Sequence, residues 1–271
     1  MTSFTNEIKA LRLKLQGFTL RANKSMFRCF PSGLLSCIAI SLCSLSVQAS
    51  VVIDATRIVY PAKEREVSLR LSNQGQKAAL VQTWIDDGRV DAKPDEVDAP
   101  FVVTPPMVRI DPSKGQSLRI AYAPSNTVPK DRESVFWLNV LDVPPLPGKQ
   151  IGNHMQFAFR TRLKLFFRPA DLPGSVSQSA EKLRWSLLGS TKGTVLRVTN
   201  DGAFHVSFNS VELKLKNGKA LKVKSHMVAP KSSADFVFEQ AINTSEIEGG
   251  VIYDWINDFG SNVHAEAKLS L

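Results

Sequence analysis

Residues 155–174 of this 271-residue chain, MQFAFRTRLKLFFRPADLPG, are the most informative part of the sequence for its fold. The first part of this stretch, Met155–Phe167, alternates apolar and polar side chains for most of its length. This alternation predicts a β-strand of roughly 13 residues, long against the usual 5–6. The part that follows, Arg168–Gly174, contains two prolines and a glycine, which do not continue a central strand. We therefore expect a strand that ends one domain, followed by a hinge into the next.

Short alternating runs bounded by turn residues lie on both sides of this hinge. Before it the strand candidates are residues 51–53, 57–60, 66–71, 79–85, 101–103, 117–122 and 135–143; after it they are residues 195–199, 206–215, 221–223, 234–238, 251–256 and 264–271. Asn217-Gly218, the favoured dipeptide of a tight hairpin, separates two of the later runs. Strands at intervals of about 8–12 residues, without a helical period of useful length, are typical of β-sandwiches. We therefore expect an all-β fold with domains at residues 50–170 and 171–271.

The net charge is distributed unevenly along the chain. Its 34 lysines and arginines against 25 aspartates and glutamates give a formal charge of +9. Residues 1–49 hold six of the basic side chains and one acid, so they contribute +5 and the remaining 222 residues only +4. A nucleic-acid-binding protein would concentrate its excess charge in the folded part, so this class is disfavoured. A hydrophobic content of 43% with 22% charged residues excludes a disordered chain and indicates globular domains with apolar cores.

The first 49 residues have the pattern of an export signal. Residues 29–53 carry no charge and include the apolar run 34–47, which basic residues precede and a small-x-small triplet ending at Ala49 closes. This pattern predicts a secretory signal peptide cleaved after Ala49. An uncleaved membrane anchor would need about 20 consecutive apolar residues, more than this serine-diluted run provides. Since a complete signal could begin at Met26, we interpret residues 1–25 as an extension from a misplaced start codon.

Neither the cysteines nor the histidines form a pattern that indicates catalysis or metal binding. Cys29, Cys37 and Cys43 all lie in the predicted signal, which leaves the mature chain without a disulfide or a thiol nucleophile. The four histidines stand alone in their segments: His154, His205, His226 and His264. Asp86-Asp87 resembles a carboxylate pair, but neighbouring strand residues point to opposite faces, so we interpret it as a solvated turn. Because hydrolase, phosphate-loop and zinc-protease motifs are also missing from the sequence, we predict no enzymatic activity, no metal and no cofactor.

The long strand at residues 155–167 has two different faces. By the period of two, one face holds Met155, Phe157, Phe159, Leu163 and Leu165, and the other holds Gln156, Arg160, Arg162 and Lys164. An ordinary strand would use its apolar face to cover its own domain core. If the first half instead runs along a sheet edge, Met155, Phe157 and Phe159 become an exposed apolar stripe. Such a stripe suits a partner that lacks a strand.

The segment VPKDRESVFWLNVLDVP at residues 128–144 carries a specific resemblance. It agrees with the signature of periplasmic chaperones of the chaperone–usher pilus pathway, from its Asp-x-Glu-Ser core through Asn139 to the closing Pro144. Shorter matches are ATRIVY at 55–60, TPP at 104–106, LKLFFRP at 163–169, VTN at 198–200 and INDFG at 256–260. Residues 50–271 thus resemble this PapD-like family. The resemblance implies two Ig-like β-sandwich domains set at an angle, with a cleft between them.

The resemblance also implies roles for particular residues. Arg57 and Lys164 match the paired cations that anchor the C-terminal carboxylate of a pilus subunit. The stripe of Met155, Phe157 and Phe159 matches the positions that a chaperone donates to an incomplete subunit fold. Glu133, Arg168 and Asp258 match an interdomain salt-bridge network. The loop at residues 146–154 is short, which is similar to the short-loop subgroup that serves rod-like pili.

The function expected from this resemblance is that of a non-enzymatic assembly chaperone in the periplasm. It would bind and stabilise pilus subunits by donor-strand complementation and deliver them to an outer-membrane usher. Neither a nucleic acid nor a small-molecule substrate is expected as a partner. An exported two-domain β-sandwich adhesin or binding module is the alternative, and it would not need cations at Arg57 and Lys164. An exported hydrolase is a third possibility, for which the sequence offers no catalytic cluster.

Overall fold

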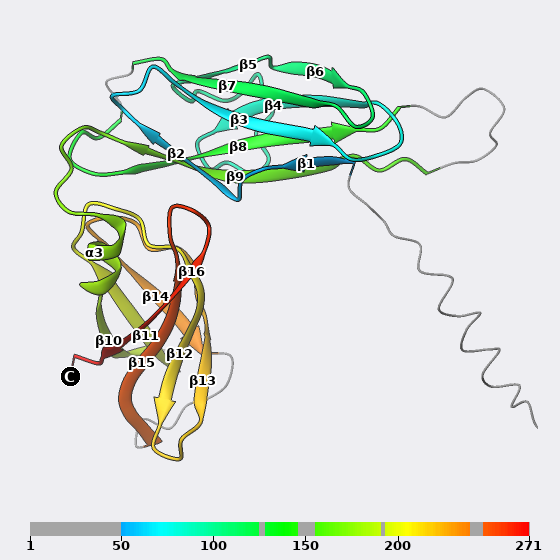
Figure 1. The fold of residues 1–271 in the computed structure, drawn as a ribbon. Helices are drawn as coiled ribbons and strands as arrows, with labels where there is room; N and C mark the ends of the chain where they lie inside the picture. Colours follow the sequence, from blue (N-terminus) through cyan, green and yellow to red (C-terminus); the bar gives the residue numbers. More distant parts are fainter. Residues whose placement is uncertain (1–49, 125–127, 146–154, 191–192, 239–245, 271) are drawn as a thin grey trace, which may run out of the picture. The chain divides into compact units, whose positions relative to one another are not determined.

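The computed structural model describes residues 50–124, 128–145, 155–190, 193–238 and 246–270 (Figure 1). The predicted signal peptide at 1–49 and the loop at 146–154 lie outside the described residues. Strands dominate the described part, in which the only helix is the short α3, Val176–Glu181. No helix in this part is long and apolar enough to cross a membrane. The all-β expectation is thereby confirmed.

The first sandwich is built from nine strands in two sheets. Its strands are β1 Val51–Ile53, β2 Arg57–Pro61, β3 Glu66–Asn73, β4 Ala79–Asp86, β5 Phe101–Thr104, β6 Met107–Ile110, β7 Gly115–Tyr122, β8 Ser134–Val143 and β9 Phe159–Arg168. One sheet has the order β1-β3-β7-β5 and the other the order β2-β9-β8-β4-β6. Alternate residues of the strands bury their side chains between the sheets, as Leu69 and Leu71 of β3 do opposite Leu163 and Leu165 of β9. Each such burial contributes about 1.5–3 kcal/mol to the free energy of folding.

Strand β9 starts later than the sequence pattern predicts. It begins at Phe159, and Met155–Ala158 belong to no strand, so the prediction of one strand from residue 155 was wrong at its start. The reason lies in the neighbouring strand. The last pair between the two strands joins Phe159 to Asp142, and β8 ends at Val143. Pro144 and Pro145 follow, and because proline has no N–H it cannot extend the ladder.

The two halves of β9 have different neighbours. From Phe159 to Phe167 the strand pairs with β8 in antiparallel fashion. On its other side the parallel strand β2 begins only at the pair Arg57–Lys164 and continues to Pro61–Arg168. The segment Phe159–Leu163, which we call the open edge, therefore pairs with β8 alone among the described strands. The condition named for an exposed apolar stripe, that the first half of this strand runs along a sheet edge, is met for these residues.

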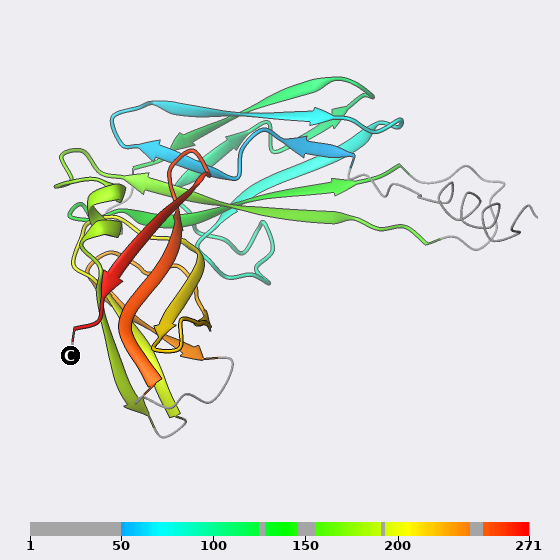
Figure 2. The ribbon, with the colours of Figure 1, turned by 60° about the horizontal axis from the view of Figure 1, so that its bottom comes forward.

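The second sandwich follows the hinge and α3. Its strands are β10 Arg184–Ser190, β11 Gly193–Asn200, β12 Phe208–Leu215, β13 Ala220–Lys224, β14 Ser232–Phe238, β15 Ile247–Ile256 and β16 Asn262–Lys268. They form one curled sheet of order β10-β11-β14-β13-β12-β15-β16, whose two ends meet at a bridge between Trp185 and Leu269. Figure 2 shows this curl from a second direction. The buried Trp185, Phe236 and Tyr253 fill its interior.

The hinge contains two residues with unusual backbone conformations. Asp171 and Gly174 both adopt positive φ, of 62° and 82°. Side chains with a β-carbon rarely adopt the φ of Gly174, which explains a glycine at this position. Ser175 then caps α3, its side chain accepting a hydrogen bond from the Gln178 amide. The chain therefore leaves β9 at Arg168 and forms no strand again until Arg184.

Candidate functional site

Arg57 and Lys164 are direct partners in the parallel ladder of β2 and β9. Partners in a ladder project from the same face of the sheet, so the two cationic side chains lie next to each other. Both side chains are half-buried. The pair stands at the point where β2 begins and the open edge of β9 ends.

Both cations reach the same point of the second sandwich, and their hydrogen-bond acceptors among the described residues are neutral. Lys164 donates from Nζ to Ser207 Oγ at 3.3 Å, and Arg57 donates from Nη1 to the Ile256 carbonyl at 3.0 Å. Ser207 and Ile256 are themselves joined, because the Ile256 amide donates to the Ser207 carbonyl at 2.9 Å. Within the described residues no carboxylate forms an ion pair with either cation, and Arg57 Nε is buried without a hydrogen-bond partner.

The electrostatics of the pair follow mainly from the burial of both side chains. Burial lowers the pKa of Lys164, and the charge of Arg57 lowers it further. Burial also lowers the pKa of Arg57, and the attraction of Asp258 and Glu133 offsets only part of that effect. An anion that bound both side chains would oppose both shifts. A carboxylate suits the site, because it accepts charge-assisted hydrogen bonds from two donors at once.

Arg168, at the end of the same strand, is fully paired with acids. Its Nε donates to Glu133 Oε2 at 2.6 Å, while Nη1 and Nη2 donate to the two carboxylate oxygens of Asp258 at 2.7 and 2.6 Å. The three residues named for a network are thus in contact, across the two sandwiches. Burial alone would lower the pKa of Arg168, but the hydrogen bonds to Asp258 and the charge of Glu133 outweigh it, so that the pKa is raised.

His205 is a member of this cluster that sequence reasoning missed. Its backbone amide and its Nδ1 both lie 2.9 Å from Glu133 Oε1, and its side chain is buried beside the Phe166 ring. The phenyl ring of Phe204 lies under the Arg168 guanidinium at 5.2 Å. An isolated histidine gives no sequence signal for such a contact, since its partner is 72 positions away in the chain.

The apolar stripe is exposed. Met155, Phe157 and Phe159 are 79%, 60% and 49% exposed, respectively. Phe159 opens β9, whereas Met155 and Phe157 precede the strand. Gln156 between them donates to the Pro144 carbonyl at 2.6 Å, which holds this approach segment close to the end of β8.

The turn at Asp86-Asp87 is different from the solvated turn predicted for it. Asp87 is indeed exposed and accepts from Arg89 Nε at 3.0 and 3.1 Å. Asp86 is fully buried and forms an ion pair with Arg162 at 2.6 Å, so for this residue the prediction was wrong. The sequence pattern of a single strand cannot show that the Arg162 side chain of β9 reaches past β8 to Asp86. In the described ranges no group of three His, Cys, Asp or Glu side chains is arranged to hold a metal ion.

Comparison with protein families finds matches for both sandwiches. Residues 50–173 match "Pili and flagellar-assembly chaperone, PapD N-terminal domain". Residues 178–267 match "Pili assembly chaperone PapD, C-terminal domain". Between the two matches lie only residues 174–177, which are the last hinge residue, the cap of α3 and the start of α3.

Individual relatives give the same result over most of the chain. The probable fimbrial chaperone YadV of Escherichia coli (strain K12) is 40% identical over 238 residues, which cover 87% of this chain and 95% of YadV. The crystal structure of the Pseudomonas aeruginosa CupB2 chaperone is 42% identical with a TM-score of 0.68, covering 81% of this chain and 100% of that one. The SafB chaperone, solved in complex with the Salmonella enterica SafA pilin, gives 26% identity and a TM-score of 0.68, covering 82% and 97%. These likenesses confirm the two-domain β-sandwich fold.

Proposed function

The chain belongs to the PapD family of pilus assembly chaperones, and we propose that it binds pilus subunits along the open edge of β9. The observation that carries this proposal is the pair Arg57 and Lys164 at the end of the open edge, two adjacent cations for which the described residues provide no acidic partner. A strand edge offers backbone hydrogen bonds to an added strand, and the cations offer a fixed end point for it.

In this proposal the C-terminal carboxylate of a subunit binds Arg57 and Lys164. Each charge-assisted hydrogen bond contributes about 1.5–3 kcal/mol to binding. The bond also sets the register, because a strand that slipped by one residue would present the wrong face to its neighbour. At about 3.3 Å per residue, Phe159 lies roughly 17 Å along the edge from Lys164. The anchor thus places the apolar stripe at a defined distance along the subunit.

The stripe of Met155, Phe157 and Phe159 is the donor in this proposal. Large exposed apolar side chains at successive alternate positions are costly in water and gain free energy when a groove covers them. A subunit whose fold lacks one strand offers such a groove. The chaperone would supply the missing strand, and so would prevent subunits from pairing edge to edge before assembly. SafB, a relative, has been solved in complex with a pilin.

Glu133, Arg168 and Asp258 have a different role in the proposal. They hold the second sandwich, residues 171–271, against the first, residues 50–170, so that Ser207 and Ile256 keep their places beside the cations. A buried network of this kind is expected to fix one arrangement of the two domains more than to add stability.

The surrounding steps complete the proposal. The signal peptide directs the chain to the periplasm and is removed after Ala49, and the subunit complex is delivered to an outer-membrane usher. No catalysis, nucleotide or cofactor takes part, so assembly proceeds by exchange of the chaperone strand for a better-fitting strand of the next subunit. The adhesin alternative is not favoured, because the relatives are chaperones over nearly their whole length.

Co-expression with a pilus subunit from the same organism tests this function. We expect the mature chain and the subunit to be recovered from periplasmic extract as a one-to-one complex, and the subunit alone to be degraded or aggregated. A chain that is exported and folded but leaves the subunit as unstable as in its absence would refute the proposal.

A further inference from the structure

The open edge of β9 is held by little apolar packing. Of the residues Phe159–Leu163, the first three are exposed, Arg162 is half-buried and only Leu163 is buried in the core. A strand segment with one neighbour and few buried side chains opens locally at low free-energy cost. An edge that must receive a partner strand in one register therefore needs another source of order.

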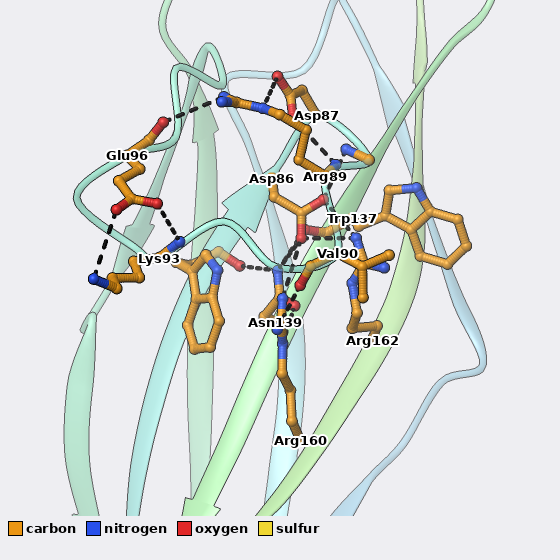
Figure 3. A network of polar contacts seen from close by, with 12 residues as sticks. Asp86, Asp87, Arg89, Val90, Lys93, Glu96, Trp137, Asn139, Arg160 and Arg162 are labelled. Atoms are coloured by element: carbon orange, nitrogen blue, oxygen red, sulfur yellow. Dashed lines mark hydrogen bonds and ion pairs between the residues drawn. The ribbon is translucent and has the colours of Figure 1, made fainter.

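A buried carboxylate two strands away supplies contacts to this segment (Figure 3). Asp86 lies at the end of β4, which is separated from β9 by β8. Its Oδ1 accepts from the Gly88 amide at 2.7 Å and from Arg162 Nη2 at 2.6 Å, and its Oδ2 accepts from Asn139 Nδ2 at 2.7 Å. Since adjacent strands are about 4.8 Å apart, the Arg162 side chain has the reach to cross β8 completely.

Arg160 makes a second crossing beside the first. Its Nε donates to Asn139 Oδ1 at 2.8 Å and its Nη1 to the Val90 carbonyl at 2.7 Å, while Nη2 lies 3.6 Å from Asp86 Oδ2. Asn139, fully buried in the middle of β8, thus donates to Asp86 and accepts from Arg160. The hydrogen bonds form a continuous chain from β9 through β8 to β4 and the loop after it.

Two tryptophans fix the orientation of the two arginines. The Arg160 guanidinium lies 4.9 Å from the centre of the Trp84 ring, and the Arg162 guanidinium lies 4.8 Å from that of Trp137. Stacking of this kind is favourable and restricts the rotamers of a long side chain. Both arginines come from the open edge.

We propose that Asp86, Asn139, Arg160 and Arg162 form a clamp that keeps the open edge of β9 extended against β8 before a subunit arrives. These are positioning residues, which act on the partner strand only through the β9 backbone. The inference rests on the proposed function in one respect, that the open edge is where the subunit binds. The clamp would preorganise the binding edge. Because the edge is already ordered in the free chain, the entropy cost of ordering it does not reduce the affinity for the subunit.

Amide hydrogen exchange on the free chain tests the clamp without any subunit. Arg160→Gln removes the charged donor to Asn139 and Val90. Loss of even one hydrogen bond to a charged group corresponds to about a tenfold factor, so we expect the β9 amides that pair with β8, within residues 159–163, to exchange at least about tenfold faster. Amides of β3 and β7 in the opposite sheet should exchange as in the wild type.

Arg109→Gln is the matched control, since it removes one exposed arginine from β6, which lies in the same sheet as β9. Equal exchange at the open edge in both variants, or acceleration in all strands alike, would overturn the clamp.

A triple variant connects the clamp to binding. Asp86→Asn with Arg160→Gln and Arg162→Gln removes every charge of the cluster and leaves no buried ion unpaired. We expect loss of measurable exchange protection at the open edge and at least about tenfold weaker subunit binding, as the ordered state becomes a minority of the free chain. Lost protection with wild-type affinity would overturn the role in binding. A wild-type chain that binds no subunit would instead refute the proposed function, and the exchange experiment would still decide the clamp.

Discussion

Arg168 and Lys164 project from the same strand, yet their surroundings are opposite. Arg168 is matched by two carboxylates, and its pKa is raised although the side chain is half-buried. Lys164 lies beside Arg57, its described partners are the neutral Ser207 hydroxyl and the Trp137 ring, and its pKa is lowered. The first arrangement satisfies its charges within the chain. The second carries an electrostatic cost that an incoming anion would remove, which distinguishes a structural cluster from a binding site.

The largest effect in this comparison is expected at Glu133. Its carboxylate is fully buried and accepts hydrogen bonds from Arg168 Nε and from the His205 amide. Glu133→Ala leaves these donors without their acceptor, so we expect a loss of about 3–5 kcal/mol in the free energy of unfolding, measured by urea titration. The control is Asp235→Ala, which breaks an exposed pair with Arg197 and should change the midpoint far less. Equal midpoints for the two variants would show that the buried network does not stabilise the fold.

The next effect concerns Lys164 and separates binding from stability. Lys164→Ala removes one donor to the subunit carboxylate, so we expect subunit affinity to fall by about 1.5–3 kcal/mol, or roughly ten- to hundred-fold. Thermal stability should not fall, because the charged form is already disfavoured in the folded chain. Lys214→Ala, which removes a cation paired with Glu266 on the second sandwich, controls for net charge. Unchanged affinity in both Lys164→Ala and Arg57→Ala would end the anchor hypothesis.

Much of the fold was predictable because alternation and turn residues are local signals. The exceptions are informative. Strands β6 and β10 and the helix α3 were missed: β6 is only four residues long and directly follows Pro105-Pro106, which resembled a break. The start of β9 was placed too early because the apolar alternation continues through Met155–Ala158 after its partner strand has ended at Val143.

The candidate site was predictable in its residues but not in its contacts. The family resemblance named Arg57, Lys164 and the acidic network, and the ladder shows that the first two are adjacent. Neither the family resemblance nor the local sequence pattern could predict the buried ion pair of Asp86. Its burial depends on Arg162, which lies 76 positions away, and on a crossing over β8 that no local pattern encodes. A polar dipeptide before a glycine is usually a solvated turn, and here only the tertiary contact overrides that interpretation.

A smaller effect is expected when the pH is raised on the complex. The carboxylate anchor needs a protonated Lys164, and burial lowers the pKa of this amine below its ordinary value of 10.5 in the free chain. Binding must then recruit a proton above that pKa, so affinity should fall by up to about tenfold per pH unit in the alkaline range. In Lys164→Arg the side chain stays charged at alkaline pH, so the affinity of this variant should not fall with pH in that range. Parallel alkaline losses in wild type and Lys164→Arg would assign the dependence to another group.

The smallest effect is expected in the free chain itself, where Lys164 carries a cost and Arg168 does not. Because the pKa of Lys164 is lower in the folded than in the unfolded state, the unfolded chain binds more protons between the two values, and wild-type stability rises with pH there. Lys164→Met lacks this titration, so it should be slightly more stable than the wild type near about pH 7, and the advantage should shrink toward about pH 10. Urea midpoints of the two proteins at several pH values measure this difference in stability.

The control is Lys214→Met, which removes the same charge from a pair with Glu266 and should show no stabilisation at neutral pH. A destabilised Lys164→Met would mean that Lys164 and Arg57 are satisfied by Ser207 and Ile256 alone, and the contrast with Arg168 would disappear.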